Sequence, residues 1–255
     1  MSDGRVVGVV GPETAGVETA VEAAGATAVE AAGATANPGP ATAVVGESDA
    51  VVAVGEAALL AVARAEPSVP VLPVDAGRGT RSVAAADVDA AVEALVAGEY
   101  DREAHPLVAV TVADRTTARA FADVMLVSAE PAEISEYAVA AGGRTVARFR
   151  ADGVAVATPL GSSGYAARAG GPVLSPSVEA VAVVPVAPFS TDLGHWVLGL
   201  DGLCLSVERD DPAVDLVADD RVVSAVEPGE TVRLSSGGSV PVAVVAASES
   251  PFERR

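Results

Sequence analysis

The stretch DGVAVATPLGSSGYAARAGGP, residues 152–172, decides how the chain is read. A β-branched apolar run ends at Thr158-Pro159, a Gly/Ser cluster follows, and the segment closes at Gly170-Gly171-Pro172. This order predicts a strand, a tight turn and a short helix with a glycine stop. Gly161 and Gly164 lack a Cβ, so a ligand can approach the backbone, and N–H groups at a helix start favour an anion. An ordinary Gly/Ser turn in a β-protein is the alternative.

The order of residues in this stretch resembles the signature of the NAD kinase family, which reads roughly TPTGSTAYSLSAGGP after an Asp-Gly pair. The chain departs from it at Leu160, Ser163, Gly164 and Arg168. The matching residues are Asp152, Gly153, Thr158, Pro159, Gly161, Ser162, Tyr165, Ala169, Gly170, Gly171 and Pro172. A match of this length indicates ancestry and a nucleotide site, whereas activity depends on further residues.

The charge of the chain bounds its partners. All 16 basic residues are Arg and stand against 35 acidic ones, which gives a formal net charge of −19. Such a surface repels nucleic acid and anionic membranes, so neither is expected as a partner. Molar salt screens this self-repulsion. The composition therefore indicates a salt-rich cytoplasm, as in a halophilic archaeon, with an acidic mesophilic protein as the alternative.

Hydrophobic patterning favours a cytoplasmic protein. The 255 residues are 50% hydrophobic but only 3% aromatic, so the core is expected to consist of small side chains. No run approaches the roughly 20 apolar residues of a membrane helix, and no signal peptide is visible. The single cysteine, Cys204, excludes an intrachain disulfide framework and a cysteine-based zinc cluster.

The N-terminal part alternates strands with helices. Apolar runs at 6–10, 49–54 and 69–74 predict buried strands, and 59–65 and 84–97 predict helices, the latter with a glycine stop at Gly98. This alternation implies a parallel, Rossmann-like sheet whose ligands lie at the carboxyl ends of the strands.

Two features between the first two predicted strands concern the helical segment there. The octapeptide TAVEAAGA occurs at 19–26 and again at 27–34. We interpret the second copy as a slipped duplication that lengthens a helix or its exit loop, since two copies do not make a solenoid. Asn37-Pro38-Gly39-Pro40 is expected to break the chain.

The C-terminal part has shorter β-branched runs divided by Gly, Pro and Asp, which predict an all-β sandwich. This change of pattern places the domains at 1–104 (α/β) and 105–255 (β-sandwich). The family resemblance implies that the first domain handles the phosphate donor, that the second binds NAD, and that the chain returns to the first domain near its end. The runs are 107–112, 120–127, 145–150, 154–158, 181–186, 196–200, 203–207, 231–234 and 242–245.

Two further family motifs are altered in this chain. The family's Gly-Gly-Asp-Gly-Thr turn, whose Asp activates the ribose hydroxyl, aligns with Val54 to Ala58, so Gly55 survives and Glu56 replaces the Asp. A carboxylate that favours the helix dipole is the alternative role of Glu56. The family's Asn-Glu pair, which holds NAD, aligns with Ala122 and Asp123. An exposed polar strand position is the alternative for Asp123.

The resemblance implies a kinase that transfers a phosphoryl group from ATP or polyphosphate, with Mg²⁺, to the 2′-hydroxyl of the adenosine ribose of NAD. Glu56 would be catalytic, and the family's members imply a homodimer or homotetramer. A dinucleotide-binding regulator without turnover, or a kinase with a lipid or sugar substrate, are the alternatives. The binding residues implied are Gly55, Asp123, Asp152, Thr158, Gly161, Ser162, Ser163, Gly164, Tyr165 and Arg168.

Three other readings complete the site. Asp152 also fits a hairpin turn, since Asp-Gly between two strands is a hairpin signal. His195 is interpreted as a packing residue and His105 as a linker residue rather than as catalysts. The sequence shows no Ser-His-Asp arrangement and no residue set with metal-ligand spacing.

Overall fold

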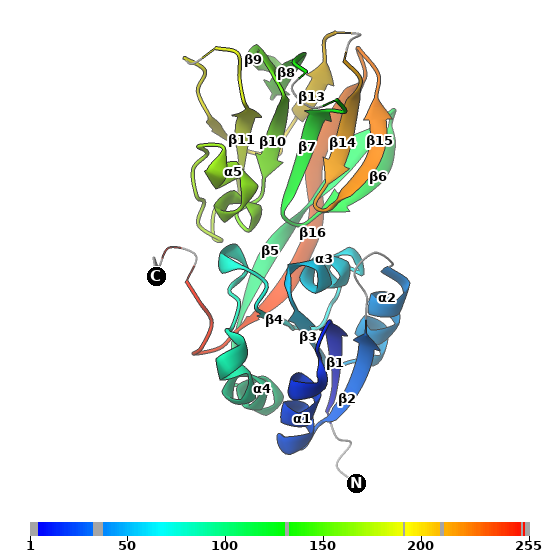
Figure 1. Cartoon of the computed structure of the whole chain (residues 1–255), viewed down its shortest axis with the longest axis vertical. Coiled ribbons are helices and arrows are strands. Elements are labelled where there is room, and N and C mark those ends of the chain that lie inside the picture. The colour runs from blue at the N-terminus through cyan, green and yellow to red at the C-terminus, as the bar shows by residue number, and fades with distance from the viewer. Residues whose placement is uncertain are drawn as a thin grey trace. The chain divides into compact units, whose positions relative to one another are not determined.

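The computed structural model describes residues 5–32, 38–130, 133–190, 192–209, 212–250 and 252. The chain divides into two compact units, one made of Met1–His105 with Ser239–Arg255 and the other of Pro106–Gly238 (Figure 1). The predicted second domain, 105–255, differs from this division because residues from 239 onward belong to the first unit. The fold class itself, an α/β unit with a parallel sheet and an antiparallel β-sandwich, is confirmed.

The first unit is a parallel sheet in the order β2-β1-β3-β4-β16 with helices on both faces. Val7 and Val9 point to the face covered by α1 and α4, whereas Gly8 lies under α2, where an added Cβ would be 2.4 Å from Val44 Cγ1. The elements are β1 (Val6–Gly11), α1 (Ala15–Ala23), β2 (Thr27–Ala32), α2 (Pro38–Glu47), β3 (Ala50–Val54), α3 (Glu56–Arg64), β4 (Val71–Val74), the 3₁₀ turns η1 (Arg78–Thr80) and η2 (Ala85–Asp87), and α4 (Val88–Ala97).

The predicted strands and helices of this unit are confirmed as β1, β3, β4, α3 and α4. The strands are continuous apolar runs because both faces of a parallel sheet are covered. Gly98 ends α4 in the left-handed conformation, with φ of 81°, and its N–H donates to carbonyls of the last turn. This is the glycine stop expected from the sequence.

The prediction for the duplicated octapeptide is wrong. The first copy forms most of α1, but the second copy begins strand β2, which pairs in parallel with β1 from Thr27 opposite Val6 onward. The exposed edge of β1 supplies backbone partners that override the weak helix preference of the segment. Thr14 Oγ1, before α1, donates to Glu30 Oε1 at 2.7 Å and fixes the second copy there. Residues 33 and 34 of this copy lie outside the described residues.

The predicted chain break at 37–40 is also wrong in part. Residue 37 lies outside the described residues, but α2 begins at Pro38. Proline is tolerated in the first helical turn because the N–H it lacks would have no partner within the helix. The sequence reading therefore missed a helix that covers one face of the sheet.

The second unit is a sandwich of two antiparallel sheets. One sheet has the order β12-β11-β10-β7-β14-β15, and in the other β16, β13, β8 and β9 are neighbours and β5 pairs with β16 and β6. The elements are β5 (Asp101–Val112), β6 (Arg115–Ala120), β7 (Asp123–Ser128), β8 (Ser135–Ala141), β9 (Arg144–Ala151), β10 (Gly153–Ala157), η3 (Gly161–Ser163), α5 (Tyr165–Arg168), β11 (Val181–Val186), β12 (Trp196–Leu198), β13 (Leu203–Val207), β14 (Val214–Ala218), β15 (Arg221–Val226) and β16 (Thr231–Val244).

Small apolar residues from both sheets form the sandwich core, as the composition predicted. Tyr137 is fully buried, and its hydroxyl donates to the Asp152 carbonyl at 3.2 Å, so its polar end is satisfied. Phe149 packs between the rings of Tyr137 and Trp196, at centroid distances of 6.3 and 6.0 Å. Three of the eight aromatic residues of the chain therefore pack together in this unit.

Strands β6, β8, β14 and β15 were not predicted from the sequence. Their apolar positions are often alanine, and polar or charged residues stand among them, as in SEYAVAA for β8 and RVVSAV for β15. In an antiparallel sheet one face can remain polar, so such segments pair without being strongly apolar. Among the residues that the structure describes, no helix has the length and apolarity to span a membrane.

A buried histidine, His105, ends the N-terminal segment of the first unit. His105 in β5 is fully buried, its Nε2 lies 3.3 Å from Glu103 Oε2, and Glu103 Oε1 accepts from Arg81 at 2.8 Å. Burial lowers the pKa of His105, and the attraction of Glu103 only partly opposes this. The linker role expected for this residue does not describe a side chain held in this way.

Substitution of His105 should change how stability depends on pH. Above about pH 6.5 the histidine is neutral in both states, whereas below it only the unfolded chain takes up the proton. The free energy of unfolding should therefore fall as pH decreases from 6.5, by at most about 1.4 kcal/mol per pH unit for one proton. In His105→Asn this part of the slope should vanish.

Urea unfolding at pH 5 to 8 in high salt measures this slope. His195→Asn is the matched control, because His195 is the other histidine of the chain and is exposed. Equal slopes in wild type and His105→Asn would contradict the expectation.

Candidate functional site

The turn between β10 and α5 is held against the loop 121–123 by Thr158. Its hydroxyl lies 2.7 Å from the Phe121 carbonyl and 3.0 Å from the Ala122 carbonyl, and its N–H donates to Ala122 O at 2.9 Å. The same hydroxyl accepts from the N–H of Gly161 at 3.2 Å. Thr158 is fully buried. Its hydroxyl therefore joins two backbone segments rather than facing outward.

Gly161 is required by packing at this turn. A Cβ at this position would lie 2.1 Å from the Ala122 carbonyl oxygen, which is inside any permitted contact distance. The absence of a side chain thus lets the turn touch the loop, whereas the sequence reading attributed it to the approach of a ligand. Gly153 and Gly171 are similar, since a Cβ would lie 2.5 Å from Leu126 O and from Val184 Cγ2, respectively.

Ser162 is also an internal residue. It is fully buried, its Oγ donates to Pro159 O at 2.7 Å, and the same Oγ accepts from Leu174 N–H at 2.9 Å. The hydroxyl holds the turn together and ties it to the chain that follows α5. Thr158, Gly161 and Ser162 therefore shape the turn from inside.

The remaining predicted residues of this turn face outward. Ser163 and Gly164 are half-buried, Arg168 is exposed, and Tyr165, the first residue of α5, is 42% exposed. A tyrosine ring this open in a chain with so few aromatic residues is available for packing on a planar ligand. These four residues are accessible to a ligand at the turn.

Asp123 begins β7 at the other side of the same contact. It is half-buried and follows Phe121 and Ala122, whose carbonyls Thr158 holds. The N–H groups of the same loop point to Asp219, which follows β14 and has φ of 55°. This role of Asp219 was not predicted, because neither its left-handed conformation nor its distant partners can be read from the sequence.

Asp152 is not brought to this cluster. It precedes β10, whereas Thr158 follows it, and a strand rises by roughly 3.3 Å per residue, so the two lie about 20 Å apart. The backbone of Asp152 is tied to its neighbours, since its N–H donates to Val186 O and its carbonyl accepts from Ser128 N–H. The prediction that Asp152 binds a ligand stays a prediction. Within one copy of the chain, Asp152 lies at the opposite end of β10 from the turn that follows Thr158.

The first unit carries Gly55 and Glu56 at the carboxyl end of β3. Gly55 has φ of 85°, which a residue with a Cβ rarely adopts, and Glu56 is the exposed first residue of α3. The first N–H groups of a helix have no partner within it, and its N-terminus favours negative charge. Ala57 lies within α3, so the strained position of this motif is still a glycine.

The donor set suits a cation that arrives with its own ligands. Among the described residues there is no group of three or more His, Cys, Asp or Glu that could enclose a metal ion. Mg²⁺ commonly binds through one or two carboxylates together with substrate phosphates and water. Glu56 fits that requirement as a single exposed carboxylate.

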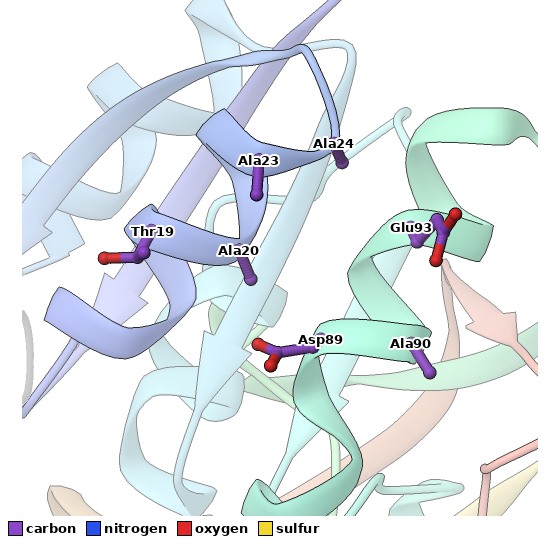
Figure 2. A pocket seen from close by; sticks show the side chains of 7 residues that line it. All are labelled: Thr19, Ala20, Ala23, Ala24, Asp89, Ala90 and Glu93. Atoms are coloured by element: carbon purple, nitrogen blue, oxygen red, sulfur yellow. The ribbon is translucent and has the colours of Figure 1, made fainter.

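Two grooves of the structure lie away from these residues. One, of about 520 Å³, lies between α1 and α4 and is lined by Thr19 and alanines of α1 and by Asp89, Ala90 and Glu93 of α4 (Figure 2). Its carboxylates would repel an anionic nucleotide. The other, of about 480 Å³, lies beside Cys204 and Arg233 in the second unit. Cys204 itself is partly exposed.

The geometry defines a class of proteins in which a parallel α/β unit is followed by a β-sandwich with a Gly/Ser turn. Residues 122–237 match the sequence model of the ATP-NAD kinase C-terminal domain. The NAD kinase of Symbiobacterium thermophilum is 33% identical over 199 residues, which cover 74% of this chain and 70% of that protein. The chain belongs to the NAD kinase family.

Other comparisons agree. The NAD kinase of Methanosarcina acetivorans is 36% identical over 134 residues, which are 52% of this chain and 48% of that protein. The solved NAD kinase of Archaeoglobus fulgidus, in complex with ATP, has a TM-score of 0.73 at 23% identity and covers 93% of this chain and 92% of that one. Yeast NADH kinase, complexed with NADH, has a TM-score of 0.76 at 17% identity, with 96% and 84% covered. Both structures show the same fold.

Gly161→Ala should destabilise the second unit. The new Cβ would meet the Ala122 carbonyl, so the turn or the loop must move, and overpacking of this kind costs about 1–3 kcal/mol. Gly199→Ala is the matched control, because nothing lies within 4 Å of its Cβ position. Urea unfolding of both variants in high salt measures the difference. Equal midpoints would show that the turn does not depend on this contact.

Proposed function

We propose that this chain phosphorylates NAD at the 2′-hydroxyl of its adenosine ribose to give NADP, with ATP or polyphosphate as the donor. Membership of the NAD kinase family is the observation that carries the proposal. The contact between the turn 158–162 and the loop 121–123 supports it, because this contact brings together two segments that the family resemblance assigns to NAD binding. A regulator that binds a dinucleotide without turnover is not favoured, since the relatives matched are NAD kinases.

The second unit would hold NAD. Ser163, Gly164, Tyr165 and Arg168 face outward from the turn and would contact the dinucleotide, with the tyrosine ring against a planar group and the guanidinium near phosphate. Asp123 would accept a hydrogen bond from a ribose hydroxyl. Asp152, which precedes β10, would bind the dinucleotide at that end of the strand.

The first unit would handle the donor. Gly55 and the start of α3 would lie near the donor phosphates, and Glu56 would take the proton of the acceptor hydroxyl. Mg²⁺, bound to the donor phosphates, supplies charge neutralisation for a reaction that depends mainly on positioning. We further propose that the chain forms a homodimer or homotetramer and works in a salt-rich cytoplasm, which light scattering and salt-dependent activity test.

Glu56→Ala should abolish most of the activity. Loss of a general base costs about 100- to 10,000-fold in rate. Asp89→Ala is the matched control, because Asp89 is an exposed carboxylate in the first turn of α4, as Glu56 is in α3. Both variants lose a similar helix-dipole interaction, of about 0.3–1 kcal/mol, so their stabilities should match while their activities differ.

The assay measures NADP formation with NAD, Mg²⁺ and either ATP or polyphosphate, in KCl up to molar concentration, beside calorimetric binding of NAD. Activity lost in Glu56→Ala and kept in Asp89→Ala supports the proposal. NAD binding without NADP formation under any of these conditions would leave a dinucleotide-binding protein, and the absence of both would overturn the NAD site.

A further inference from the structure

The geometry points to Asp219 as a positioning residue that sets the affinity for NAD by fixing the backbone that carries Asp123, without touching the ligand itself. This inference rests on the proposed function of the second unit. Asp219 follows β14 and lies 96 positions after Asp123 in the chain.

The Asp219 carboxylate gathers three successive backbone N–H groups. Oδ1 accepts from Phe121 at 2.9 Å, from Ala122 at 2.7 Å and from Asp123 at 3.3 Å, and Oδ2 lies 3.1 Å from the Phe121 nitrogen. The N–H of Asp219 donates in return to the Asp123 carbonyl at 2.9 Å. The aspartate therefore binds the loop through its side chain and its main chain together.

Successive N–H groups that converge on one point form a concavity that binds anions. Here the anion is part of the protein, so a ligand phosphate does not enter this concavity. The charge of Asp219 thus satisfies the amides of the loop, and charge-assisted hydrogen bonds are roughly twice as strong as neutral ones. What the loop offers to a ligand is reduced to the Asp123 side chain.

The same loop is held from its other side. Thr158 takes the Phe121 and Ala122 carbonyls, and the Gly161 backbone packs on Ala122 O. The backbone N–H and carbonyl groups of Phe121 and Ala122 are therefore all hydrogen-bonded to protein atoms. The position of the Asp123 carboxylate relative to the turn at 163–165 then depends on Asp219 and Thr158 as a pair of opposing clamps.

The left-handed conformation of Asp219 determines which substitution is informative. Its φ is 55°, a value that asparagine adopts more readily than most residues. Asp219→Asn therefore keeps the turn and one acceptor oxygen but removes the charge that attracts the three amides. Alanine would add backbone strain and confuse the result.

In Asp219→Asn we expect the Kd and KM for NAD to rise about 10- to 100-fold, which corresponds to about 1.4–2.8 kcal/mol and is the scale of one hydrogen bond to a charged group such as the Asp123 carboxylate. The KM for ATP should change less than about twofold. Deuterium exchange of the amides at 121–123 should accelerate. Asp220→Asn is the matched control, because it removes the same charge from the neighbouring residue. The Asp220 side chain is 36% exposed and lies near Arg221.

A double-mutant cycle with Asp123→Ala separates positioning from general destabilisation. If Asp219 acts through Asp123, its substitution should add little once the Asp123 carboxylate is gone, whereas an independent effect would multiply. All variants are compared as the full chain at the salt concentration of highest wild-type activity.

Three outcomes are decisive. If the wild-type chain forms NADP, and Asp219→Asn binds NAD more weakly with an unchanged KM for ATP and with effects that do not multiply in the cycle, the inference is supported. Wild-type turnover with Asp219→Asn indistinguishable from Asp220→Asn overturns it and leaves the proposed function intact. A wild-type chain that binds no NAD overturns the proposed function, and this inference with it.

Discussion

The backbone of the β10–α5 turn can lie against the loop 121–123 only because residue 161 has no Cβ. Everything else at this end of the sandwich follows from that approach. The Thr158 hydroxyl then reaches two carbonyls of the loop, and Asp219 satisfies the opposite N–H groups. Buried backbone groups must be paired, so each contact requires the next. The result is a rigid support from which a few side chains face outward.

This arrangement separates two kinds of residue within one motif. Thr158, Gly161 and Ser162, which match the family pattern, are buried, and so is Leu160, which departs from it. Ser163, Gly164 and Arg168, which also depart from the pattern, are half-buried or exposed, and so is Tyr165, which matches it. Packing constraints act on the first group whatever the ligand is, because a displaced turn would leave polar groups unpaired. The motif therefore identifies the family's fold more directly than it identifies the reaction.

The strands and helices that the sequence predicted are those with continuous apolar runs or a glycine stop, such as β1, β11 and α4. Strands such as β8 were missed because their stability comes from neighbours in the sheet, which a local pattern does not contain. The site divides in the same way. Gly161 and Ser162 were found by their motif, but their internal roles were not, and Asp219 was missed because its partners lie far away in the chain.

The octapeptide TAVEAAGA gives the first unit one more consequence. One copy is helical and the adjacent copy is a strand, so its secondary structure is chosen by position rather than by composition. The outer edge of a parallel sheet offers a row of backbone partners to any segment that reaches it. In this chain the second copy extends the sheet by one strand, whereas the first copy lies mostly in a helix. Copying errors at such an edge can thus add a structural element in one step, without a new sequence having to be selected residue by residue.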